Sequence, residues 1–366
     1  MGSKVFRGRI FDGFDLFDDH RLVLEDGLVV GFEPAQGGHS GETKLPHHII
    51  LHPGFIDLQV NGGGGVMFND DPSLAALEVM AEAHLGLGTV GFLPTLISDS
   101  PEKTKCAIEA VGLAMRRNLP GILGLHLEGP HIAPSKKGAH ALAHIREMTE
   151  ADLAVLLQAA EELPNIMVTV APENTTQAQV TALAQAGVIV SLGHTDADYA
   201  TCMAYFEAGA SCVTHLFNAM SQLNSRAPGL VGAALQNGLA AAGVIADGHH
   251  VAPANLGLIW AMKGAPERLF LVSDSMATAG SEITSFELNG RQINRSGGTL
   301  RLSDGTLAGA DLDLGTAVRV LIKTGIDEET ALRAAITIPR QVLRSPIGYG
   351  PIQIGKPCRP VMLELP

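Results

Sequence analysis

The chain has 366 residues, of which 46% are hydrophobic and 17% are charged, and its formal net charge is −13. This composition excludes a disordered chain and can fill the core of a large domain with a small one appended. The acidity excludes a broad electrostatic grip on nucleic acid or an anionic membrane, so we expect neither as a partner.

The first 50 residues predict short strands and turns. From His52 onward, apolar runs rich in β-branched residues alternate with stretches rich in Ala, Leu and Glu. Eight strand-like runs occur at residues 52–60, 89–97, 121–129, 166–173, 187–194, 210–218, 240–248 and 269–275. Helical stretches separate nearly all of them, for example 73–86, 101–117, 148–160, 175–186 and 197–208. This alternation predicts parallel strands joined by helices.

Eight strands with intervening helices are what a closed barrel requires. We therefore expect an α/β fold, with a TIM-type (β/α)8 barrel over residues 52–340. Residues 283–309 predict β-hairpins with turns at Asn289-Gly290 and Asp304-Gly305, and helices are expected near 311–324 and 328–337. The tail ends in a short strand that could pair with the N-terminal strands. A small β-sandwich domain would then be built from both chain termini, residues 1–51 and 341–366.

The cysteines are scattered and form no CxxC pair, which argues against a cysteine zinc site or a disulfide framework. No apolar run reaches the length of about 18 residues that a membrane span needs, and the N-terminal segment does not resemble a signal peptide. Free thiols suit a reducing compartment, so we expect a cytoplasmic protein. The four cysteines are Cys106, Cys202, Cys212 and Cys358.

Four reactive side chains fall at the carboxyl ends of predicted barrel strands, where the active sites of such barrels lie. They are Glu128, His194, His215 and Asp274. Two imidazoles and one carboxylate make a three-ligand metal set with a position left for water, and Asp274 is then free to act as general base and acid. Each residue alone could be a structural group or a helix cap. Their joint placement at one rim favours a metal site.

The first barrel strand carries Gln59-Val60-Asn61, where many metal barrels carry two histidines two residues apart. Residues at this spacing face the same side of a strand. Carboxamides are weak zinc ligands, so the second metal site that the histidines would complete is expected to be absent. Gln59 and Asn61 could instead hydrogen-bond the barrel mouth, which is compatible with a single metal ion.

Several long segments resemble those of the N-acetylglucosamine-6-phosphate deacetylases of the amidohydrolase superfamily, in the same order along nearly the whole chain. The segments are PGFIDLQVNGGGG (53–65), HLEGPHIAPSKKGAH (126–140), LGHTDA (192–197), THLFNAM (214–220), ADGHH (246–250), LVSDSMATAG (271–280) and GTLAG (305–309).

The resemblance implies hydrolysis of the acetamide of N-acetyl-D-glucosamine 6-phosphate to D-glucosamine 6-phosphate and acetate. It assigns Glu128, His194 and His215 as metal ligands and Asp274 as the acid/base. It also implies a homodimer and one divalent metal ion per subunit, with zinc first and iron, cobalt or manganese as alternatives. The substrate contacts implied by the family are Ala139, His140, Asn218, Ala219, Arg226, His250, Leu307, Ala308 and Gly309.

Three alternatives remain open from the sequence. Another amidohydrolase is disfavoured because it would usually show paired histidines on strand one and often a lysine on strand four, where this chain reads IMVTVAPE. A catalytically inactive scaffold is disfavoured because it would not need all four reactive side chains at the barrel rim. A deacetylase for a related acetylated amino-sugar phosphate differs only in pocket geometry, which motifs define poorly. His131 and His249 depart from the family pattern and are interpreted as supporting or surface residues.

Overall fold

The computed structural model describes residues 2–345, 348 and 350–365; Met1, 346–347, 349 and Pro366, which belong to the expected terminal domain, lie outside the described residues. Eight parallel strands form one sheet in the order β15-β14-β13-β12-β11-β10-β9-β6. Its strands are β6 (Phe55–Val60), β9 (Thr89–Ile97), β10 (Leu125–Glu128), β11 (Ile166–Val170), β12 (Ile189–Leu192), β13 (Cys212–Val213), β14 (Ala241–Val244) and β15 (Leu269–Leu271). The eight expected strands are confirmed.

The sheet closes where the first strand meets the segment after the last one. Val60 and Ser275 form a parallel bridge, and the Asp274 amide donates to the Gln59 carbonyl over 3.1 Å. Every residue of β6 and β9 is buried, as expected for parallel strands that are covered on both faces. The predicted (β/α)8 barrel is therefore confirmed.

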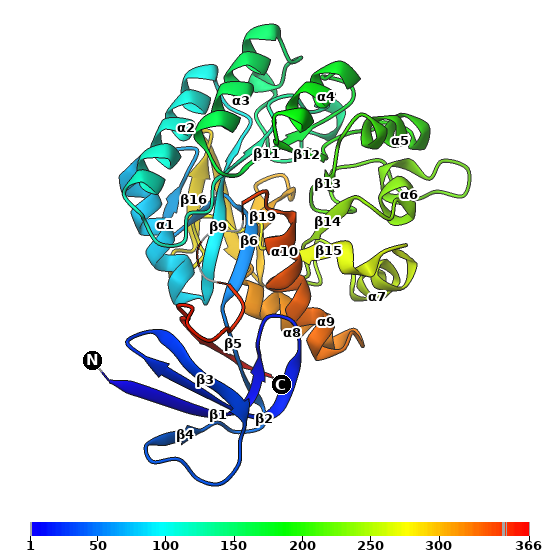
Figure 1. Cartoon of the computed structure of the whole chain (residues 1–366). Coiled ribbons are helices and arrows are strands. Elements are labelled where there is room, and N and C mark those ends of the chain that lie inside the picture. Colours follow the sequence, from blue (N-terminus) through cyan, green and yellow to red (C-terminus); the bar gives the residue numbers. More distant parts are fainter. Residues whose placement is uncertain (1, 346–347, 349, 366) are drawn as a thin grey trace.

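Helices form the outer layer of the barrel (Figure 1). They are α1 (Leu74–Gly86), α2 (Pro101–Arg116), α3 (Glu150–Glu162), α4 (Gln177–Gln185), α5 (Tyr199–Glu207), α6 (Gly229–Gln236), α7 (Pro253–Met262), α8 (Leu314–Lys323), α9 (Glu328–Ala335) and α10 (Thr337–Val342). Capping residues determine where several of them begin; Thr149 and Asp152, for example, form a reciprocal capping box at α3. Among the described residues, none of the helices has the length and apolar character needed to cross a membrane.

A four-stranded antiparallel sheet follows the last barrel strand. It contains β16 (Ser285–Leu288), β17 (Arg291–Ser296), β18 (Thr299–Leu302) and β19 (Leu307–Ala310). Asn289 and Gly290 both have positive φ, as the predicted hairpin turn requires. The Ala310 amide donates to the Asp274 carbonyl over 2.9 Å, so this sheet is attached to the barrel next to Asp274.

The two chain ends meet in a separate six-stranded sheet of order β20-β5-β1-β2-β3, with β4 paired to β1. Its strands are β1 (Ser3–Phe11), β2 (Leu16–Glu25), β3 (Leu28–Pro34), β4 (Glu42–Lys44), β5 (Ile49–His52) and β20 (Val361–Glu364). The expected pairing of the tail with N-terminal strands is confirmed by the antiparallel β20–β5 ladder, and Figure 1 shows both termini on this side. The domain boundaries at 51/52 and 340/341 stay a prediction.

Candidate metal centre and active site

The four rim residues lie where strands of the barrel end. Glu128 is the last residue of β10, and His194, His215 and Asp274 follow within three residues of the ends of β12, β13 and β15. The backbone φ angles of these last three residues are +48°, +26° and +48°. Residues other than glycine rarely adopt this left-handed region, and such strain is concentrated at functional sites. All four side chains line one cavity at the barrel mouth.

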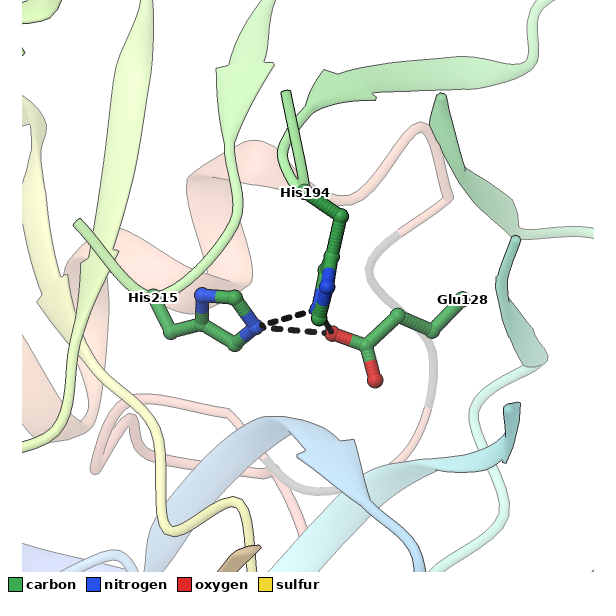
Figure 2. A group of neighbouring side chains, drawn as sticks. All are labelled: Glu128, His194 and His215. Carbon is green, nitrogen blue, oxygen red and sulfur yellow. Dashed lines mark hydrogen bonds and ion pairs between the residues drawn. The ribbon is translucent and has the colours of Figure 1, made fainter. Parts of the chain in front are cut away.

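Three donor atoms converge on one point between the strands, and Figure 2 shows their side chains directed toward one another. Glu128 Oε1 lies 3.2 Å from His194 Nε2 and 2.9 Å from His215 Nε2, while the two Nε2 atoms are 3.0 Å apart. A zinc ion bonded at about 2.0–2.1 Å needs donors at about this separation. Among the residues that the structure describes, this is the only such His/Cys/Asp/Glu group, and it could hold a divalent metal ion.

The ring of His194 is fixed in the tautomer that a metal requires. Its Nδ1 atom lies 2.7 Å from the carbonyl oxygen of Lys136. Because a carbonyl only accepts hydrogen bonds, Nδ1 carries the proton and donates it, and the neutral ring keeps its lone pair at Nε2. His215 Nδ1 is buried and has no hydrogen-bond partner within the described part of the chain.

Glu128 is held as a carboxylate by its histidine neighbours. Burial acts to raise its pKa, but the electrostatic effect of the neighbouring imidazoles of His140, His194 and His215 outweighs burial and holds the pKa well below its usual range. Burial acts to lower the pKa of His215, and the Glu128 carboxylate outweighs it so that the pKa is raised. The site therefore favours a cation among these three groups, which is the condition a divalent metal ion satisfies.

Asp274 lies beside the donor triangle and is not one of its members. Gln59 Nε2 donates to Asp274 Oδ1 over 3.0 Å and to Glu128 Oε1 over 2.9 Å, and Asn61 Nδ2 donates to the same Asp274 oxygen over 2.7 Å. Burial and the nearby Glu128 carboxylate raise the pKa of Asp274 to about 6. Gln59 and Asn61 thus donate hydrogen bonds to carboxylates at the barrel mouth, the role that the sequence offered them in place of metal binding.

His140 presents a neutral N–H group to the cavity. The Ser98 amide donates to its Nδ1 over 3.2 Å, so that atom carries a lone pair and the proton is on Nε2. His140 Nε2 lies 3.6 Å from Glu128 Oε2. Burial lowers the pKa of His140 to about 4, which keeps the ring uncharged near neutral pH. The side chain is placed to donate a hydrogen bond to a bound group.

The cavity has a volume of about 540 Å³, which suits a small molecule. Most of the substrate contacts expected from the motifs line it: Ala139, His140, Asn218, Ala219, His250, Leu307 and Gly309. Ala308 is fully buried behind this wall. Arg226 lines a neighbouring hollow instead, which shares Lys136 with the main cavity.

The sequence did not single out one residue that lines the cavity and one that supports a lining residue. Arg301 reaches the cavity from β18, and only the folding of the hairpin sheet over the barrel mouth brings it there. Asp247 Oδ2 accepts a hydrogen bond from His250 Nδ1 over 2.6 Å, which orients the imidazole. Asp247 belongs to the quoted ADGHH segment, so its spacing from His250 could have suggested this pair.

The glycine run after β6 holds the segment that follows Asp274. The amides of Gly64 and Gly65 donate to Ala279 and Ala277 carbonyls over 2.7 and 2.9 Å. A Cβ atom on Gly62 would lie 2.4 Å from the Val66 carbonyl oxygen and 2.8 Å from the Ala277 nitrogen. The run is therefore needed for close backbone packing at the barrel mouth.

Comparison with known proteins identifies relatives along nearly the whole chain. The sequence is 40% identical to the N-acetylgalactosamine-6-phosphate deacetylase of Shewanella sp. (strain ANA-3), with 94% of this chain and 87% of the relative covered. It is 36% identical to the N-acetylglucosamine-6-phosphate deacetylase of Haemophilus influenzae, with 95% and 91% covered.

The fold agrees with these relatives. A crystal structure of N-acetylglucosamine-6-phosphate deacetylase from Pasteurella multocida matches with a TM-score of 0.89 at 34% identity, covering 98% of this chain and 94% of that one. The model of the amidohydrolase family matches residues 50–358, a range that includes all four rim residues. The chain belongs to the amidohydrolase family.

Proposed function

We propose that this protein hydrolyses the acetamide of N-acetyl-D-glucosamine 6-phosphate to D-glucosamine 6-phosphate and acetate. The observation that carries the proposal is the placement of Asp274 next to three converging metal donors at the edge of one cavity. Relatives named as deacetylases of acetylated amino-sugar 6-phosphates support the substrate class.

The metal ligands would be Glu128, His194 and His215, with one divalent ion per subunit. Zinc is the first choice because two imidazoles and one carboxylate form a set that it prefers, and iron, cobalt and manganese accept the same donors. When bound, such an ion activates water and polarises the acetamide carbonyl.

The proton transfers fall to Asp274. Its carboxylate accepts a proton from the attacking water, whose oxygen joins the acetamide carbon. The same carboxyl then donates the proton to the amine nitrogen as the C–N bond breaks, so that acetate and the amino sugar leave. A pKa of about 6 suits a group that must both accept and return a proton near neutral pH. The His140 N–H would donate to the oxyanion.

The remaining residues that the resemblance implies would bind the sugar phosphate. The contacts proposed are Ala139, His140, Asn218, Ala219, Arg226, His250, Leu307, Ala308 and Gly309. Arg226 faces the neighbouring hollow in this chain, so its contribution to the phosphate is best tested together with the homodimer that we also propose. A cytoplasmic location is part of the same proposal.

A second candidate substrate is N-acetyl-D-galactosamine 6-phosphate, the C4 epimer. The 40% identical relative named for that substrate favours it, while the 36% identical relative and the Pasteurella multocida structure are named for the glucosamine compound. Both reactions break the same acetamide bond, so the metal ligands and Asp274 would act in the same way on both epimers. The residues that contact the sugar would determine which epimer is preferred.

Acetate release from both epimers tests the proposal, with zinc-loaded protein and with the Asp274→Asn variant as the control. We expect release that depends on metal and on Asp274, with the larger kcat/KM on the glucosamine compound. A larger value on the galactosamine compound would reassign the substrate. No release from either by metal-loaded protein would refute the proposed function.

A further inference from the structure

Four polar side chains lie inside the barrel beneath the metal donors. His126, Thr169 and Ser191 belong to β10, β11 and β12, and Thr214 follows β13. The exposed fraction of each is between 0% and 4%. Branched apolar residues ordinarily fill the interior of such a barrel, and burying polar groups costs free energy unless they are hydrogen-bonded. Four polar residues at one level therefore need an explanation.

These side chains form one continuous series of hydrogen bonds. His126 Nδ1 lies 3.1 Å from the Leu58 carbonyl oxygen, and its Nε2 lies 2.8 Å from Thr169 Oγ1. Thr169 Oγ1 is 2.7 Å from Thr214 Oγ1, which is 2.6 Å from Ser191 Oγ. We call this series the hydroxyl chain. It links strands that carry metal ligands with the strand between them.

The Leu58 carbonyl at one end of the hydroxyl chain determines which group donates in each of its hydrogen bonds. The Leu58 carbonyl can only accept, so His126 Nδ1 carries the proton and the neutral ring accepts at Nε2. Thr169 must then donate to His126, Thr214 to Thr169, and Ser191 to Thr214. Because the series ends at a carbonyl oxygen, it has no acceptor that could pass a proton onward. The hydroxyl chain therefore holds its side chains in fixed positions and does not transfer protons.

Each metal ligand is adjoined by part of the hydroxyl chain. His126 lies two residues before Glu128 on β10, and Thr169 is in register with Glu128 on the next strand. Thr214 immediately precedes His215. A Cβ atom on Gly193 would lie 2.8 Å from Thr214 Cβ and 3.0 Å from Thr169 Cγ2. The backbone that leads into His194 therefore rests directly on the two threonines.

We propose that the hydroxyl chain of His126, Thr169, Thr214 and Ser191 positions Glu128, His194 and His215 for metal binding. The inference rests on the proposed metal site and adds Thr169 as its central positioning residue. Thr169 donates to His126, accepts from Thr214 and packs against Gly193, so it is the one member that contacts the segments of all three ligands. Residues that hydrogen-bond metal ligands directly typically change metal affinity about 10–100-fold when mutated, and we expect the same scale for the hydroxyl chain, which acts on the ligands through their backbone.

The test compares Zn²⁺ affinity in three variants, measured by competition with a chromophoric chelator after the metal has been removed from the whole protein. Thr169→Val keeps the side-chain shape and removes the hydroxyl, and we expect it to weaken Zn²⁺ binding about 10–100-fold. Thr169→Ser keeps the hydroxyl and should restore most of the affinity.

Thr104→Val is the matched control. Thr104 is a buried threonine on α2, and its hydroxyl bonds only the Ser100 carbonyl among its described partners. The Zn²⁺ affinity of Thr104→Val should equal that of the wild type.

Thermal unfolding of the metal-free variants separates positioning from plain stability. If Thr169→Val lowers the melting temperature and leaves Zn²⁺ affinity unchanged, the inference is wrong. If Thr169→Val does not fold, Ser191→Ala decides, since it removes only the terminal donor of the hydroxyl chain. It should weaken Zn²⁺ binding relative to the wild type, and unchanged affinity would overturn the inference. Wild-type protein that binds none of Zn²⁺, Fe²⁺, Co²⁺ and Mn²⁺ would overturn the proposed function as well, whereas equal Zn²⁺ binding by wild type and variants would overturn the role of the hydroxyl chain alone.

Discussion

Asn61 and Asp274 are joined across the seam where the barrel closes, by a hydrogen bond of 2.7 Å from Asn61 Nδ2 to Asp274 Oδ1. Gln59 Nε2 donates to the same oxygen over 3.0 Å. The two carboxamides place N–H donors where a related barrel with paired histidines would place metal ligands. They hold the carboxylate of Asp274 beside the donor triangle without adding charge to it.

Replacing Asn61 with aspartate tests this relationship through pH. Asn61→Asp exchanges a donor for a second carboxylate next to Asp274, and a like charge raises the pKa of a carboxyl group. The reaction needs the ionised base, so the rate falls as pH drops through the pKa of Asp274. We expect the acidic limb of the kcat/KM profile for acetate release to move to higher pH in the variant.

The control is Asn61→Ala, which removes the same hydrogen bond and adds no charge. Its acidic limb should move much less than that of Asn61→Asp. Equal profiles for the wild type and Asn61→Asp would show that Asp274 is not the group whose ionisation limits the reaction.

Asp274→Asn should separate catalysis from metal binding. The amide cannot accept the proton of the attacking water, and a positioned acid/base is worth about 10²–10⁴-fold in rate. Because Asp274 lies outside the donor triangle, the variant should keep its metal ion. Acetate release and metal content measured on the same preparation check both parts, and loss of metal together with activity would place Asp274 among the ligands.

Asp57 should make the free energy of unfolding depend on pH. Asp57 is 1% exposed, and burial raises the pKa of its carboxyl group from its ordinary value of 3.8 to about 7. Between these two values the unfolded chain has released the proton and the folded chain still holds it, so stability falls as pH rises from about 4 to about 7. The loss attributable to this group is roughly 4 kcal/mol.

Asp57→Asn removes that titration and keeps an oxygen that can accept from the Ser273 amide, now 3.2 Å from the carboxylate. Urea unfolding of variant and wild type at several pH values measures the difference. We expect the free energy of unfolding of the variant to rise steadily relative to that of the wild type between pH 4 and pH 7. A difference that does not change with pH would mean that the Asp57 carboxyl is ionised in the folded protein.

The strands, and therefore the rim, were predictable because the alternation of apolar and helical stretches marks where each barrel strand ends. Glu128, His194, His215 and Asp274 then meet at one edge by the geometry of parallel strands alone. The supporting contacts were not predictable in the same way. The Lys136 carbonyl that fixes the His194 tautomer is 58 residues away in the chain, and Ser98 reaches His140 from a different strand end.

Side chains on connecting segments were the hardest to place. The resemblance implied that Arg226 contacts the substrate, but the loop after His215 directs Arg226 into a neighbouring hollow. Arg301 lies on a strand whose hairpin was predicted, and only the attachment of that sheet beside Asp274 brings it to the cavity. Local sequence patterns define elements, whereas such positions depend on how distant elements pack.

Gly62→Ala should disrupt the barrel mouth. A Cβ atom there would lie 2.4 Å from the Val66 carbonyl oxygen and 2.8 Å from the Ala277 nitrogen. Both are backbone atoms, and Ala277 belongs to the segment that follows Asp274. Overpacking of this kind typically costs about 1–3 kcal/mol. We expect a lower free energy of unfolding together with a fall in kcat.

The matched control is Gly86→Ala on α1, where a Cβ atom meets nothing within 4 Å and helix propensity favours alanine. This variant should leave kcat unchanged and keep or raise the free energy of unfolding. A Gly62→Ala variant with wild-type kcat and stability would show that the close backbone packing of the glycine run is not required to hold Asp274.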